Sequence, residues 1–192
     1  MNRRLLISVL FVCLLSFTVR AQQGTFRFAQ LTDIHLSPNN PNPTEDLLRS
    51  IAQINAIDSL DFVLVTGDLT EEGDRATMEK VKSCLDLLKV KYYVALGNHE
   101  TKWSDSGCTA FGEIFGGERF DFEHKGFLFL GFNSGPLMRM AYGHVVPQDI
   151  RWMTERMSRY NTGNPRQNNP VILVTHYPMT EGDVDNWYEV TD

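Results

Sequence analysis

The spacing of apolar positions changes in a regular order along the chain. Residues 25–31 alternate between apolar and polar, while residues 61–66 and 92–96 are almost continuously apolar, as strands buried on both faces are. Between these runs, apolar residues recur at intervals of three and four, which predicts two amphipathic helices. The first has Asn42 as cap and Pro43 at its first helical position, and the second covers roughly residues 75–89. Their inward faces are Leu47, Leu48, Ile51, Ile54 and Ile57 in the first and Val81, Cys84, Leu85 and Leu88 in the second.

The order strand, helix, strand, helix, strand predicts a largely parallel sheet with right-handed crossovers and helices packed on it. The second half of the chain has a different pattern. Residues 101–118 are polar and Gly-rich, which predicts a loop with a short helix, and residues 120–123 and 127–132 predict a hairpin. A helix begins at Pro147 with Ile150, Met153 and Met157 on one face, and a last strand covers residues 171–174. The fold class is therefore α/β.

Chemistry-bearing side chains follow four of these strands. They are Asp33 and His35, then Asp68 after Gly67, then Asn98, His99 and Glu100 after Gly97, and finally His176. Each group alone also fits a polar turn after a strand. The carboxyl ends of parallel strands, however, meet at one edge of a sheet, where α/β folds place their sites. In an extended segment Asp33 and His35 would point to the same side, and a glutamate beside a histidine can orient its ring.

Mixed oxygen and nitrogen ligands favour a pair of borderline divalent ions such as Mn, Fe or Zn. A carboxylate that touches both ions can hold them about 3.5 to 4 Å apart, close enough to share a hydroxide and bind a phosphoryl group. The pattern therefore predicts a metal-dependent hydrolase of phosphoesters, with a small-molecule phosphoester as its substrate.

Together the four groups resemble the first four motifs of calcineurin-like metallophosphoesterases, in order and over nearly all of residues 25–180. The resemblance implies an αββα sandwich of two mixed sheets flanked by helices, with two metal ions at one edge. It implies that Asp33 and His35 hold one ion, that Asn98 and His176 hold the other, and that Asp68 bridges them. His99 would stabilise the transition state or protonate the leaving oxygen, with Glu100 as its orienting partner.

Departures from related families narrow the branch. Glu71 stands where purple acid phosphatases have the tyrosine that binds ferric iron, and Asp74-Arg75-Ala76 does not match the Asp-Arg-Gly of protein serine/threonine phosphatases. A generic branch remains, similar to bacterial cyclic-nucleotide phosphodiesterases. The family's last motif, Gly-His-x-His, does not follow His176, and Gly143-His144-Val145-Val146 lacks the second histidine, which favours a loop there.

Two interpretations of the missing motif stay open, because each ion would lack one imidazole. In one, residues 22–192 are a metallophosphoesterase domain without its C-terminal strands, truncated before the last metal-ligand motif. In the other, the chain is a divergent, non-catalytic metal-binding module of the same fold. A third interpretation, an unrelated α/β domain with polar strand ends, requires all four groups to coincide by chance.

The first 21 residues have the form of a cleavable signal peptide. Arg3 and Arg4 precede an apolar run over residues 5–17, and cleavage is expected after Ala21, which predicts a secreted or periplasmic protein. No later segment has the length and apolarity of a membrane span. Removal of the leader shifts the formal charge from −6 to −9, and no basic stripe suits a nucleic acid. Cys84, on an apolar helix face, is expected as a buried free thiol instead of a disulfide partner of Cys108.

Overall fold

Two three-stranded sheets form the centre of the protein. The computed structural model describes residues 24–136, 142–162 and 170–179. In the first sheet β1 (Phe28–Leu31), β2 (Phe62–Thr66) and β3 (Lys91–Ala95) are parallel, in the order β1-β2-β3. In the second, β5 (Phe127–Gly131) pairs antiparallel with β4 (Phe120–His124) and parallel with β6 (Val171–Val174). The predicted parallel unit, hairpin and last strand are confirmed.

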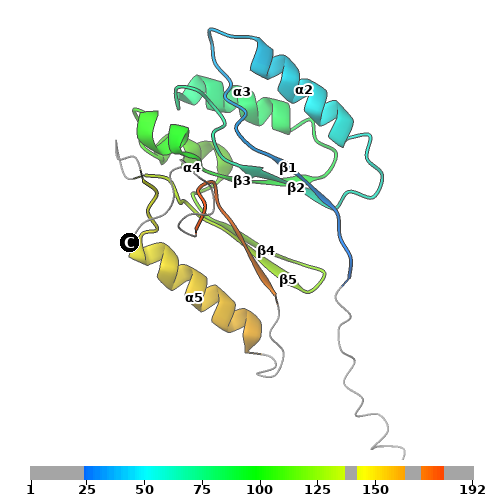
Figure 1. Ribbon diagram of the computed structural model, residues 1–192, viewed down its shortest axis with the longest axis vertical. Coiled ribbons are helices and arrows are strands. Elements are labelled where there is room, and N and C mark those ends of the chain that lie inside the picture. Colours follow the sequence, from blue (N-terminus) through cyan, green and yellow to red (C-terminus); the bar gives the residue numbers. More distant parts are fainter. Residues whose placement is uncertain (1–23, 137–141, 163–169, 180–192) are drawn as a thin grey trace, which may run out of the picture.

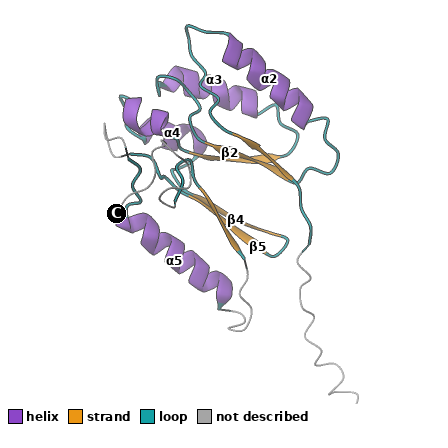
Figure 2. Cartoon of the chain, in the orientation of Figure 1, coloured by secondary structure: helices purple, strands orange, loops and turns teal. Residues whose placement is uncertain are grey.

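Helices cover the outer face of each sheet, so the protein has four layers (Figure 1). The first sheet is covered by α2 (Asn42–Ile54), α3 (Arg75–Leu85) and α4 (Thr109–Phe115), and the second by α5 (Pro147–Asn161). Figure 2 shows the resulting order of helix, sheet, sheet and helix. The αββα sandwich implied by the sequence is confirmed. No helix in the described ranges combines the length and the apolarity that crossing a membrane requires.

The core explains why β2 is apolar without alternation. Val63 and Val65 pack outward against α2, α3 and α4, while Phe62 and Leu64 pack between the sheets with Phe129. A strand whose two faces are both buried has no position left for a polar side chain. A third apolar cluster joins the second sheet to α5 through Leu128, Leu130, Phe132 and Met153. Cys84 is a buried free thiol, as expected, and Cys108 is also free and half-buried.

Two helix predictions need correction in detail. The predicted cap of α2 is wrong by one residue: the helix begins at Asn42, Pro41 holds the cap position, and Pro43 is the second helical residue. The Asn42 N–H donates to the side chain of Asn40 at 3.1 Å. Only Leu47, Ile51 and Ile54 of its predicted face are buried, because Leu48 lies one position round the helix and Ile57 follows its end. Helix α5 likewise turns Met153 and Met157 toward the second sheet and leaves Ile150 exposed.

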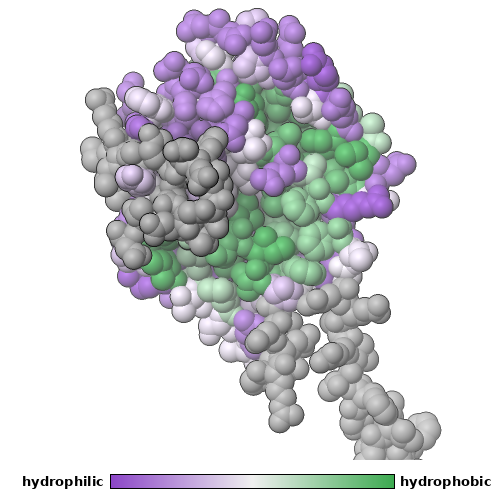
Figure 3. Space-filling view, in the orientation of Figure 1, coloured by the Kyte–Doolittle hydropathy of each residue, from purple (hydrophilic) through white to green (hydrophobic). Residues whose placement is uncertain are grey.

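One side of the sandwich is apolar and open. β1 and β6 lie on the same side of the molecule, and Figure 3 shows hydrophobic side chains gathered there. Phe28 of β1 and Leu173 of β6 are both more than two-fifths exposed. Within the described residues, no strand pairs with the outer edge of either strand.

Candidate metal centre

The ends of β1, β2, β3 and β6 bring the predicted ligands together. The Nε2 atoms of three histidines surround one carboxylate oxygen, Oδ2 of Asp68: His176 at 3.4 Å, His35 at 3.7 Å and His99 at 3.8 Å. Oδ1 of Asp33 lies 3.8 Å from the His35 Nε2, and Oδ1 of Asn98 lies 3.1 Å from the His176 Nε2. Asp68 is 5% exposed and Asp33 is 42% exposed, so the group runs from the interior to the surface.

The backbone reaches this arrangement in a way that the sequence analysis did not predict. Asp33, His35 and Asp68 have φ values of 53°, 48° and 50°, which belong to the left-handed region. The expectation that Asp33 and His35 share a side because their segment is extended is therefore wrong. The two loops run beside each other, and the N–H groups of Asp33 and His35 donate to the carbonyls of Gly67 and Asp68 at 3.1 and 3.0 Å. Left-handed non-glycine residues cost about 1–3 kcal/mol each and cluster at functional sites, although turns such as those at Ser59 and Lys125 contain them too.

Two glycines allow the loops after β2 and β3 to touch. A Cβ at Gly67, whose φ is 97°, would lie 2.6 Å from the Gly97 Cα, and a Cβ at Gly97 would lie 2.1 Å from Oδ1 of Asp68. Any side chain at these positions would push the loops apart. With both glycines present, the His99 N–H donates to Oδ1 of Asp68 at 3.0 Å. This bond fixes the Asp68 carboxylate with its Oδ2 facing the histidines.

Two of the three histidines have their second ring nitrogen hydrogen-bonded to a backbone carbonyl. Nδ1 of His176 lies 2.8 Å from the carbonyl of Thr66, and Nδ1 of His99 lies 2.6 Å from the carbonyl of Glu71. Because a carbonyl only accepts, both Nδ1 atoms carry the proton, and Nε2 of each ring faces Asp68, where it can donate to the carboxylate when the ring is charged or offer a lone pair to a cation when the ring is neutral. Nδ1 of His35 lies 3.0 Å from the Glu71 carboxylate but makes no hydrogen bond with it. Glu71 therefore holds the His99 ring through its carbonyl and only approaches the His35 ring through its carboxylate.

The sequence did not indicate this role of Glu71. There the residue served only to argue against purple acid phosphatases, which have a tyrosine at that position. Its position on the same loop, three residues after Asp68, is the signal that could have indicated it. Among the described residues, His35, Glu71 and His99 form one group able to hold a metal ion, and Asp33, His35 and Asp68 form the other.

Glu100 lies behind the site instead of beside His99. It is fully buried, and its Oε1 accepts from the N–H groups of Leu69 and Thr70 at 2.9 and 3.1 Å, while its Oε2 accepts from the N–H of Gly97 at 3.0 Å. The proposed orientation of His99 by Glu100 is thus corrected, since the Glu71 carbonyl occupies Nδ1 of that ring. Burial and the negative charge of Asp68 raise the pKa of Glu100. Its carboxylate fastens the loop after β2 to the loop after β3.

Charge and spacing fit a divalent cation. Burial by itself would raise the pKa of Asp68, but the bond and charge of His176 and the N–H of His99 outweigh it and lower that pKa. Burial likewise acts to lower the pKa of His176, and the Asp68 carboxylate raises it overall. Metal bonds to nitrogen or oxygen of about 2.0–2.2 Å place neighbouring ligands about 3.0–3.5 Å apart, close to the spacing found here. The mixed donors are those of borderline ions.

His144 lies outside this group. It belongs to the loop before α5 and lines a separate cavity with Cys108, Arg119 and Asp149. The prediction of a loop at this position is confirmed.

Comparison with known proteins gives concordant results. The sequence model of the family described as calcineurin-like phosphoesterase matches residues 26–192. A protein named 3',5'-cyclic-nucleotide phosphodiesterase from Nostoc sp. is 25% identical over 157 residues, which cover 78% of this chain and 56% of that protein. An uncharacterized protein of Bacillus subtilis, YvnB, is 25% identical over 118 residues, 53% of this chain and 9% of its own length. The chain thus spans about half the length of the first relative and a small part of the second.

Proposed function

Because the chain belongs to the calcineurin-like phosphoesterase family, we propose that it hydrolyses phosphomonoesters or phosphodiesters with two divalent metal ions at the edge where β1, β2, β3 and β6 end. The observation that carries this proposal is the convergence of three imidazole Nε2 atoms on Oδ2 of Asp68. Asp33 and His35 would hold one ion, Asn98 and His176 the other, and Asp68 both. Mn, Fe and Zn suit this mixture of donors.

Bound ions would supply Lewis acidity toward the phosphoryl group and lower the pKa of a water molecule. The residues of the chain supply position and proton transfer. The Glu71 carbonyl holds the Nδ1 proton of His99, so a second proton on that ring would sit at Nε2 and be available to the leaving oxygen. Asp68 is held by the His99 N–H, so the carboxylate and the proposed acid keep a fixed relation.

A phosphodiester is the favoured substrate within this class. The named Nostoc relative supports it, because that protein is called a cyclic-nucleotide phosphodiesterase and its similarity covers most of this chain. Glu71 in place of a tyrosine argues against the ferric site of purple acid phosphatases.

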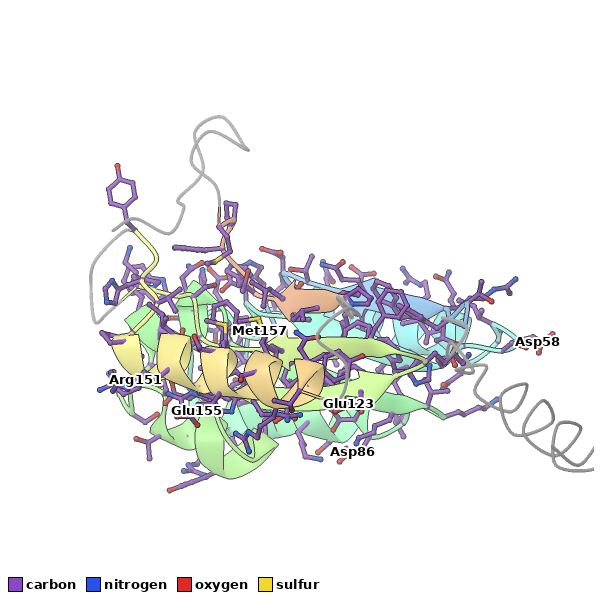
Figure 4. The ribbon with its side chains drawn as sticks, turned by 90° about the horizontal axis from the view of Figure 1, so that it is seen from below. Asp58, Asp86, Glu123, Arg151, Glu155 and Met157 are labelled. Carbon is purple, nitrogen blue, oxygen red and sulfur yellow. The ribbon has the colours of Figure 1, made fainter. Side chains whose placement is uncertain are left out.

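The test compares hydrolysis of bis(p-nitrophenyl) phosphate and p-nitrophenyl phosphate by the purified chain with added Mn²⁺. We expect Asp68→Asn to lower the rate by about 100-fold or more and to weaken Mn²⁺ binding measured by calorimetry. Asp58→Asn is the matched control, because Asp58 is exposed and projects at the far end of the molecule (Figure 4). Metal binding without hydrolysis would favour the non-catalytic module, and equal rates in both variants would contradict the proposal.

We also propose that the protein is exported and that the leader is removed after Ala21. The charged start, the apolar run and the small residue before Gln22 support this proposal. Residues 1–21 lie outside the described residues. N-terminal sequencing of protein recovered from outside the cytoplasm should begin at Gln22, and a retained Met1 would contradict it.

A further inference from the structure

A large aromatic side chain stands beside the candidate metal centre without a place in the core. Trp103 is the last residue of a short π-helix, His99–Trp103, and is 52% exposed. Its ring centre lies 6.4 Å from that of His99, with the planes at 57°. The apolar residues buried under α3 and α4 do not include it. An exposed tryptophan next to a proposed catalytic histidine is available to contact whatever binds there.

The π-helix that carries Trp103 is held at both ends. Glu100, the second residue of the π-helix, is fixed by three backbone N–H groups of the neighbouring loops. Gly73, with φ of 64°, packs so closely that a Cβ there would lie 2.4 Å from the His99 carbonyl and 2.8 Å from the Ser104 nitrogen. A side chain on a fixed backbone loses less conformational freedom when a ligand covers it.

Lys102 adds a positive charge to the same surface. Its ammonium lies 5.0 Å from the centre of the Trp103 ring, within the range of a cation–π contact. The surface thus offers an aromatic face for a planar group and a cation for an anionic one. His99 links it to the centre, because its Nε2 lies 3.8 Å from Asp68 and its ring neighbours Trp103.

We propose that Trp103 stacks against the nucleobase of a nucleotide phosphoester whose phosphate lies at the metal centre. The inference rests on the proposed function, and it adds the class of organic group that the site selects. A sugar separates base from phosphate in a nucleotide, and the His99 ring separates Trp103 from Asp68 in the site. Stacking of this kind tolerates different bases, because every base has a π face.

Binding tests the inference without depending on turnover. The full chain is loaded with Zn²⁺ and titrated with adenosine 5'-monophosphate, ribose 5-phosphate and inorganic phosphate by calorimetry, with tryptophan fluorescence as a second readout. We expect adenosine monophosphate to bind more tightly than ribose 5-phosphate and to quench fluorescence. Trp103→Ala should weaken its binding about 10-fold, Trp103→Phe should restore most of it, and phosphate binding should not change.

Trp152→Phe is the matched control, because Trp152 lies on α5, packs against the apolar cluster under that helix beside Arg119, and is not at the metal centre. It should leave the affinity for adenosine monophosphate unchanged. If adenosine monophosphate and ribose 5-phosphate bind alike, or if Trp103→Ala weakens both equally, the stacking role is overturned while the proposed function stands. If inorganic phosphate itself does not bind the metal-loaded protein, the proposed function fails and the inference falls with it.

Discussion

Replacement of Glu100 by alanine removes the acceptor of three buried backbone N–H groups, those of Leu69, Thr70 and Gly97. These groups belong to the loops that carry Asp68 and Asn98. The consequence for stability can be worked from the bonds. A buried donor without a partner costs about 1–3 kcal/mol, so three of them cost about 3–9 kcal/mol. Burial and the negative charge of Asp68 raise the pKa of Glu100, which indicates that burying its charge offsets part of the stabilisation from these three hydrogen bonds. The net loss on replacement should therefore lie in the lower half of the range.

Glu100→Gln should cost about half as much. The glutamine keeps one carbonyl oxygen, but its NH₂ group must face an N–H donor of either Gly97 or the Leu69 and Thr70 pair. For a domain of this size, a loss of about 4 kcal/mol lowers the melting temperature by about 8–16 °C.

Urea unfolding followed by circular dichroism, with a chelator present to remove metal, measures these differences. Glu155→Gln is the control, because Glu155 projects from the solvent side of α5 and forms only an exposed pair with Arg159 (Figure 4). The unfolding free energy should fall in the order control, Glu100→Gln, Glu100→Ala. If Glu100→Ala unfolds within about 1 kcal/mol of the unchanged protein, the carboxylate does not fasten the loops and the reasoning is refuted.

Three further predictions concern other parts of the molecule. Gly97→Ala should weaken Mn²⁺ binding at least about tenfold by calorimetry, because the added Cβ would collide with the Asp68 carboxylate. Gly112→Ala in α4 should leave the affinity unchanged, and equal affinities in the two variants would contradict this prediction. The hydrogen bond from Lys125 lowers the pKa of Asp61 from 3.8 to about 2, so its stabilisation is present above pH 4 and lost as pH falls toward 2. In Asp61→Asn, the unfolding free energy measured with urea should fall less between pH 4 and pH 2 than in the unchanged protein. The same pH dependence in both proteins would refute this prediction. Burial raises the pKa of Cys108 to about 12, so little of its thiol is ionised at pH 8. A disulfide reagent should therefore modify Cys108 much more slowly in the folded than in the unfolded protein, and similar rates would contradict this prediction.

Much of the fold could be predicted because apolar spacing reports burial directly. The run over β2 is continuous since one set of its side chains faces the helices and the other faces the second sheet. The meeting of Asp33 and Asp68 at one edge followed from parallel strands ending together. His176 comes from β6 of the second sheet, and its place beside them was implied by the family resemblance. The buried faces of the helices were predicted less accurately, because apolar spacings of three and four residues do not define where a buried face ends. Leu48 and Ile150 were assigned to such faces and are exposed in the structure.

The supports of the site could not be predicted, because they depend on contacts between loops about thirty residues apart. Nothing local in the sequence tells that Glu100 reaches the N–H groups of Leu69 and Thr70, or that the Glu71 carbonyl meets His99. The left-handed backbone at Asp33 and Asp68 is equally invisible, since aspartate adopts that region more readily than most residues but nothing in its neighbours along the chain shows where it does so.

The exposed apolar side along β1 and β6 should make self-association of this protein depend on ionic strength. Two copies can approach through the exposed Phe28 and Leu173 and through the strand edges that no described strand covers. Their net formal charge of −6, or −9 without the leader, opposes this approach. Salt shortens the range of that repulsion to about 8 Å at physiological strength, and it leaves the apolar attraction in place. Self-association should therefore rise with ionic strength, and low salt is the condition under which the single molecule is best preserved.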